Sequence, residues 1–141
     1  MEAERLPRGA DPARHVKLGR GGLSDVEWLV QTLQLRHAHE HAALRTTSTL
    51  EALKALVHAG LLPAQDAEVL HRAWSLATRI RAGNMVWSGK PSDVVPTKRG
   101  DLEAVARWCG YEPGQASRFE EDYLRTTRQA RQLFEKHFYG L

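Results

Sequence analysis

The sequence is short of cysteine, of long apolar runs and of excess charge, and each shortage excludes a class of protein. Its 141 residues include a single cysteine, Cys109, which rules out an internal disulfide and a zinc site built from cysteines and is typical of a reducing compartment. No stretch approaches the ~20 apolar residues that a membrane-spanning helix requires, and the N-terminus lacks the apolar core of a signal peptide. We therefore expect a cytoplasmic protein with no membrane partner.

The charge is small and unevenly placed. The formal net charge is +3, and residues 1–22 hold five basic and three acidic side chains, so +2 of it lies there. The remaining residues are nearly neutral, with 15 basic and 14 acidic side chains. A general nucleic-acid-binding domain presents a larger basic surface, so we expect no nucleic-acid partner.

The alternating apolar pattern of β-strands is also missing, and apolar residues recur with the three-to-four-residue spacing of helices. A first helix is expected from Ser24 to about His41. Another starts at Pro63 and carries its apolar face up to Gly83, ahead of a polar loop at 88–97. The other helices are expected at 48–59, 101–109 and 116–138.

The fold class that follows is all-α, a bundle of about five helices preceded by an irregular arm. Residues 1–22 are rich in Arg, Pro and Gly without periodicity, so we assign them to an N-terminal arm and glycine loop. Residues 23–141 form the bundle domain. A short strand at 15–18 is expected only where a neighbouring domain supplies a sheet.

Two capping boxes mark helix starts, Ser24-x-x-Glu27 and Ser48-x-x-Glu51. In this motif the serine hydroxyl accepts a hydrogen bond from a free backbone N–H of the first turn. Gly60 stands where a left-handed residue would end the second helix.

The segment Lys17-Leu-Gly-Arg-Gly-Gly-Leu-Ser-Asp-Val-Glu-Trp28 brings a lysine and a glycine loop directly into a helix start. Glycines let backbone N–H groups crowd around a ligand, and a helix N-terminus adds positive partial charge, a combination that suits phosphate. A plain glycine linker entering a capped helix has the same pattern, so the residues alone leave both interpretations open.

The same string resembles a motif of the glutamine synthetase adenylyltransferases and of the related uridylyltransferases of nitrogen signalling. The segments Leu44-Arg-Thr-Thr-Ser-Thr-Leu-Glu-Ala-Leu53 and Gly89-Lys-Pro-Ser-Asp93 also resemble that family, in its order and spacing. The resemblance runs from about Arg5 to Tyr139. It implies that the motif closes a nucleotidyltransferase domain and opens a helical bundle, and the ending Phe138-Tyr-Gly140 favours the C-terminal half of the parent protein.

The resemblance also implies the parent's chemistry. ATP donates AMP to a tyrosine of glutamine synthetase, with magnesium, and so regulates nitrogen assimilation. Nucleotidyltransferases of this type carry a Gly-Ser pair followed by Asp-x-Asp, whose carboxylates hold the magnesium ions. This sequence has neither. We therefore expect a fragment whose nucleotidyltransferase domain is missing, catalytically incomplete and binding neither ATP nor magnesium tightly.

We place Lys17, Gly21, Gly22 and Asp25 near the parent's active site. The resemblance raises Asp25 in particular, because an aspartate follows the Gly-Gly pair in both related enzyme groups. Lys17 could meet a phosphate as a point charge. Three roles stay open for this group: phosphate contact, support of a metal ligand, or a purely structural link between domains.

No metal site is predicted. His37 and His41 are four residues apart, a spacing adequate for two zinc ligands on one helix face, but no third ligand accompanies them. Arg79, Arg81 and Asn84 form a candidate surface for an anionic partner, against the alternative of a solvated helix end.

A second hypothesis belongs to another class of protein. The chain could be a stand-alone helical module that binds glutamine synthetase or a PII-type regulator without any nucleotide role. Its four tryptophans fit core or interdomain packing better than a platform for stacking bases.

Overall fold

A computed structural model describes residues 6–140; residues 1–5 of the predicted arm and Leu141 lie outside them. The described residues form an irregular N-terminal segment, five α-helices and one 3₁₀ turn, with a single isolated β-bridge and no longer strand. The elements are α2 (Leu23–His37), η1 (Ala42–Leu44), α3 (Thr49–His58), α4 (Ala64–Ser88), α5 (Arg99–Trp108) and α6 (Ala116–Phe138). The all-α bundle with an irregular arm is thus confirmed.

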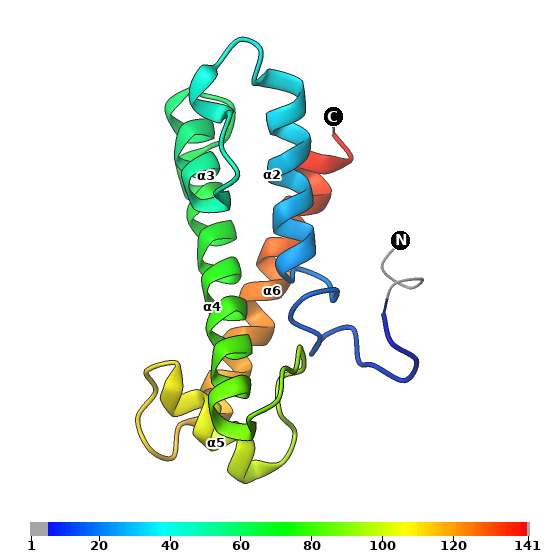
Figure 1. Cartoon of the computed structure of the whole chain (residues 1–141), viewed down its shortest axis with the longest axis vertical. Helices are drawn as coiled ribbons and strands as arrows, with labels where there is room; N and C mark the ends of the chain where they lie inside the picture. The colour runs from blue at the N-terminus through cyan, green and yellow to red at the C-terminus, as the bar shows by residue number, and fades with distance from the viewer. Residues whose placement is uncertain (1–5, 141) are drawn as a thin grey trace.

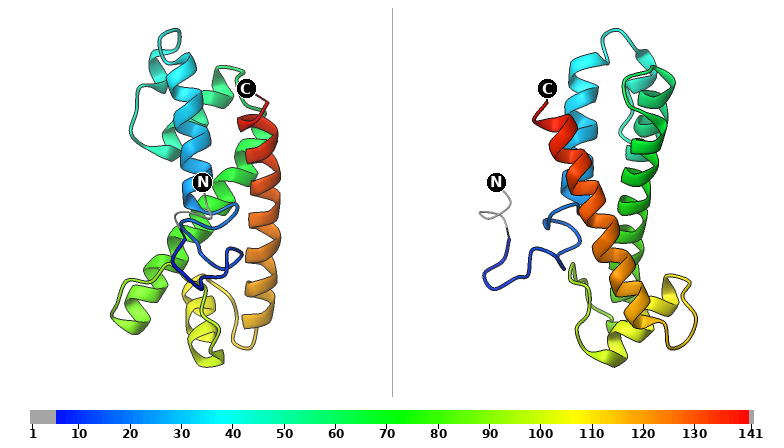
Figure 2. Two further views of the ribbon diagram at one scale, coloured as in Figure 1. Left: turned by 90° about the vertical axis from the view of Figure 1, so that its right-hand side faces the viewer. Right: turned by 180° about the vertical axis from the view of Figure 1, so that it is seen from behind.

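Two long helices, α4 and α6, form the spine of the molecule (Figure 1). Helices α2 and α3 pack against one end of this pair, and α5 packs against the other (Figures 1 and 2). None of the helices in the described part of the chain combines the length and apolar character that crossing a membrane demands.

The apolar core is divided into two clusters that follow this arrangement. One joins α2, η1 and α3 to the first half of α4 and the last turns of α6. The other joins α5 to the second half of α4 and the first half of α6, and it also takes in Val16 of the arm, Leu23 and Val95. Trp74 packs against both clusters, in the middle of α4.

The two capping boxes have different outcomes. Ser48 is the N-cap of α3, and its hydroxyl accepts a hydrogen bond from the Glu51 backbone N–H at 3.3 Å. The box at Ser24 is wrong: α2 begins at Leu23, with Gly22 as its N-cap and no side-chain cap. The glycine loop delivers the chain into the helix two residues before the expected cap, so Ser24 lies inside the first turn.

Helix ends depart from the sequence pattern in two places. Helix α2 stops at His37, short of His41, and α4 runs through Gly83 to Ser88. Gly89, with φ +75°, takes the left-handed position that ends α4. Gly83 lies inside α4 where α5 crosses it, and a Cβ atom there would lie 2.9 Å from Cδ1 of Trp108. Here glycine permits a close approach of two helices, and it does not end one.

Candidate functional site

The glycine loop is an ordered turn whose backbone donors are engaged within the chain. The N–H groups of Gly22, Leu23 and Ser24 donate to the carbonyls of Gly19, Val16 and Lys17 at 3.0, 2.8 and 2.9 Å. The N–H of Gly19 donates to the His15 carbonyl at 2.9 Å. These donors therefore stabilise the loop itself and do not converge on an open anion site.

Asp25 ties the loop to α6. Its Oδ2 atom accepts a hydrogen bond from the Gly21 N–H at 2.7 Å and pairs with Nη1 of Arg131 at 3.0 Å. Both side chains are largely buried, 14% exposed for Asp25 and 19% for Arg131. A carboxylate in the first turn also suits the helix dipole. Asp25 thus fixes the glycine loop just ahead of the helix and does not cap a free N–H group of the first turn.

The glycines of the loop are required by close contacts. Gly21 has φ +74°, and a Cβ atom there would overlap the carbonyl oxygen of Thr127 on α6. A Cβ atom on Gly22 would lie 2.6 Å from the Val16 carbonyl oxygen. The loop therefore lies directly on the α6 backbone, at a distance that only glycine allows.

Lys17 differs from the other predicted site residues. It is half-buried, yet its ammonium group makes no ion pair or side-chain hydrogen bond with any described residue. Among Lys17, Gly21, Gly22 and Asp25, it alone has a charged group that the fold does not use.

Next to the loop, the arm pairs with the segment that follows α4. The Val16 N–H donates to the Asp93 carbonyl at 2.7 Å, and the Val95 N–H donates to the Arg14 carbonyl at 2.9 Å. His15 and Val94 form the isolated antiparallel bridge. The short strand considered at 15–18 is thus a single bridge within this chain, and its partner is the loop at 89–98.

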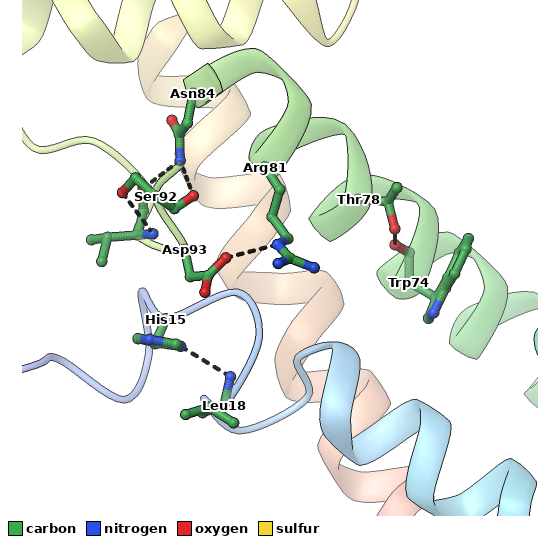
Figure 3. Close-up of polar contacts among 9 residues, drawn as sticks. His15, Leu18, Trp74, Thr78, Arg81, Asn84, Ser92 and Asp93 are labelled. Carbon is green, nitrogen blue, oxygen red and sulfur yellow. Dashed lines mark hydrogen bonds and ion pairs between the residues drawn. The ribbon is translucent and has the colours of Figure 1, made fainter. Parts of the chain in front are cut away.

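Helix α4 holds that loop through side chains. Asn84 donates from Nδ2 to the carbonyls of Ser92 and Val94 at 2.9 and 3.0 Å, and Arg81 pairs with Asp93 at 2.7 Å (Figure 3). Arg81 and Asn84, two of the three candidates for an anionic surface, therefore serve the fold.

Arg14 is the residue of this region that the sequence analysis missed. Its guanidinium pairs with Glu120 of α6 at 2.5 Å and donates to the carbonyls of Val95 and Pro96 at 3.2 and 2.5 Å. Arg14 and Glu120 are 106 residues apart, and no local pattern connects them. One side chain thus fastens the arm, the loop and α6 together.

His15 is buried between the arm and the loop at 89–98, next to Arg14. Burial lowers its pKa, and nearby Lys17 and Arg81 add to the shift, whereas Asp93 opposes it. The ring is therefore neutral at pH 7. Its Nδ1 atom accepts a hydrogen bond from the Leu18 N–H at 2.9 Å, which puts the ring proton on Nε2 (Figure 3).

The histidine pair does not share a helix. His37 is the last residue of α2, and His41 precedes η1. Within residues 6–140, no three His, Cys, Asp or Glu side chains gather as a metal site would require. Cys109 is buried, and burial raises its thiol pKa to about 11, so the sulfur stays protonated and packs as an apolar atom.

Comparison with known proteins shows the family of this chain. Residues 3–138 match the family model described as GlnD PII-uridylyltransferase. The chain belongs to this family. It is 56% identical over 140 residues to the bifunctional glutamine synthetase adenylyltransferase/adenylyl-removing enzyme of Leifsonia xyli subsp. xyli, and 54% and 51% identical to proteins of that name from Streptomyces avermitilis and Mycobacterium avium.

These similarities confirm the resemblance drawn from the glycine loop and the two later segments. Each alignment covers 98–99% of this chain but only 14% of the relative. The chain therefore spans about one seventh of the length of the curated relatives it matches.

Proposed function

We propose that this chain is the helical domain of a glutamine synthetase adenylyltransferase/adenylyl-removing enzyme, in its C-terminal half. The whole protein then transfers AMP from ATP to a tyrosine of glutamine synthetase in the cytoplasm, and residues 1–22 link the bundle to the nucleotidyltransferase domain. The observation that carries this is 56% identity across 99% of the chain to an enzyme of that name. Such uniform similarity favours a domain of this enzyme over a stand-alone module that binds glutamine synthetase or a PII-type regulator.

Magnesium and ATP belong to the rest of the protein in this proposal. Magnesium requires near-ideal octahedral geometry and is usually bound through one or two carboxylates, several waters and the substrate phosphates. Asp25 offers one carboxylate, and its Oδ2 atom is occupied by Gly21 and Arg131. Residues 6–140 offer no group of ligands that fits a magnesium site, and we expect the isolated chain to be inactive.

The predicted site residues then divide by role. We propose that Lys17 contacts an anionic group at the edge of the active site, because its ammonium group has no partner in the described fold. Asp25 acts as a positioning residue through Gly21 and Arg131. Gly21 and Gly22 let the loop lie close to its neighbours.

The first experiment compares the whole protein with the 141-residue chain. Each is mixed with glutamine synthetase, magnesium and ATP labelled in the α-phosphate. We expect the whole protein to label glutamine synthetase and the chain alone to leave it unlabelled. Labelling of a PII-type protein from UTP, in place of glutamine synthetase from ATP, would assign the protein to the uridylyltransferase branch.

The second experiment tests Lys17 within the whole protein. Lys17→Met keeps the apolar stem and removes the charge, so we expect transfer to slow by about tenfold or more, as for loss of one charged contact to phosphate. The thermal midpoint should stay unchanged. Arg8→Met, on the same arm and exposed, is the matched control. Equal transfer rates for the two variants would leave the glycine loop as a structural link only.

A further inference from the structure

Exposed apolar side chains gather at the end of the bundle where α4 meets α5. Five of the described large apolar side chains form this tip surface: Met85, Val86, Trp87, Val94 and Trp108, which are 49, 64, 57, 41 and 51% exposed. The last turns of α4 diverge from α6 at this end (Figure 2, left). Soluble monomers ordinarily expose large apolar side chains singly, so five at one end of a small domain are unusual.

The two tryptophans tie the end of α4 to α5, and Asn84 ties it to the loop that carries Val94. Trp108 packs on Gly83 of α4, and Trp87, one turn after Gly83, donates from its indole N–H to Asp101 of α5 at 2.8 Å. On the other side, Asn84 holds the Val94 carbonyl at 3.0 Å. The two indoles are therefore fixed by the fold and are presented to solvent as rigid anchors, a common feature of interface hot spots.

The rim of the patch is positively charged. Lys90, Lys98 and Arg107 are exposed around it and form no ion pair with a described residue. Of the carboxylates at the same end, Asp93 pairs with Arg81, and Asp101 keeps its charge while accepting from Trp87, so the three cations outnumber it. A complementary surface is apolar at its centre and acidic at its edge.

We propose that the tip surface is covered by another domain of the same longer polypeptide, through an apolar surface with an acidic rim. This inference rests on the proposed function only in requiring that the chain be part of a longer protein. The curated relatives are about seven times longer than the chain, so most of such a protein is available to cover it. Two exposed indoles favour permanent cover within one polypeptide over an occasional partner, because uncovered they promote aggregation.

Hydroxyl-radical footprinting of the whole protein and of the chain tests the contact. We expect oxidation of Met85, Trp87 and Trp108 to be at least fivefold slower in the whole protein, whereas Leu35, 86% exposed at the other end of the bundle, reacts equally in both. Equal rates at the tip would overturn the proposal. Protection that appears only when glutamine synthetase is added would also overturn it.

Substitution at Val86 tests the charge of the partner. In the isolated chain, Val86→Glu and Val86→Lys should each change the thermal midpoint little. The difference between the two variants in the isolated chain is the reference for the whole protein. In the whole protein, Val86→Glu should lower the midpoint well beyond Val86→Lys, because it meets an acidic rim. Leu35→Glu is the matched control. A lower midpoint for Val86→Lys than for Val86→Glu would contradict an acidic rim on the partner domain. No effect of either variant would contradict the contact itself. Neither result bears on adenylyl transfer.

Discussion

Gly21 is the point at which the loop has least freedom. Its φ is +74°, and a side chain there would overlap the Thr127 carbonyl. Gly60 has φ +76° but open space around it, so it provides the matched control. We expect Gly60→Ala to cost about 1 kcal/mol of unfolding free energy, the price of a left-handed residue alone, and Gly21→Ala to cost at least about 3 kcal/mol. Urea unfolding of both variants measures the difference. Equal midpoints would mean that the α6 backbone at Thr127 shifts to make room for the new side chain.

Asp66 couples the start of α4 to the end of α6. Its Oδ2 atom lies 2.8 Å from Nε2 of His137 and 3.5 Å from Nζ of Lys136. Burial raises the pKa of Asp66, but these two partners outweigh burial and hold the pKa below its ordinary value. Because the folded state favours the carboxylate, its contribution to stability is complete above the unfolded pKa of about 3.9 and is lost as the pH falls through the lower folded value.

Asp66→Asn should therefore destabilise the chain by about 1–2 kcal/mol at pH 7, and the gap to the wild type should close below about pH 4. Glu68→Gln is the control on the same helix, since Glu68 is exposed and 3.5 Å from Arg72. That variant should shift the urea midpoint little at any pH. A gap for Asp66→Asn that is equally wide at pH 3 and pH 7 would show that its charge is not what stabilises the fold.

At the scale of elements, the loop at 89–98 depends on the arm for its order. Arg14→Met keeps the apolar stem and removes the donors that serve Glu120, Val95 and Pro96. We expect a loss of about 2 kcal/mol of local stability, which is about 30-fold faster amide hydrogen exchange at Val16 and Val95. Arg8→Met, also on the arm, should leave both amides protected. Unchanged exchange in Arg14→Met would show that the backbone hydrogen bonds between the arm and the loop are enough to order the loop.

The helices themselves were predictable because their signals are local. Apolar spacing located every one, and α6 was predicted at its observed ends. Gly83 is ambiguous in the sequence because glycine is typical both of a helix end and of a close helix crossing, and only the position of Trp108 separates the two. The capping box at Ser24 fails because the start of α2 depends on the path of the preceding loop, which the motif does not encode.

The candidate site was less accessible to sequence reasoning. The glycine loop was recognisable, but the partners of its residues come from α6, 106 residues away in the case of Asp25 and Arg131. The Arg14–Glu120 pair has the same separation. Contacts of this kind are set by the packing of the bundle, so periodicity and spacing cannot reveal them.

At the scale of the whole molecule, two apolar clusters share the same two long helices. Trp74 packs against both, and α4 and α6 cross from one cluster to the other. We expect a single cooperative unfolding transition, in which helix content by circular dichroism and tryptophan fluorescence change at the same urea concentration.

Variants at the two ends make this test sharper. Leu56→Ala and Val105→Ala remove fully buried side chains from different clusters. Each should lower the one midpoint by an amount equivalent to about 2–4 kcal/mol, without broadening it. An early transition limited to α5 in Val105→Ala would show instead that the two ends unfold separately.

The length of α4 has a mechanical consequence. Its 25 residues form an unbroken rod of about 37 Å, anchored at one end by Asp66 and carrying Trp87 at the other. A rigid rod converts rotation into displacement, so a tilt of about 5° at the Asp66 end would move the far end by about 3 Å. Because Arg81 and Asn84 near that end hold the loop at 89–98, which pairs with the arm, we expect a tilt of α4 to displace the arm and the glycine loop that follows it.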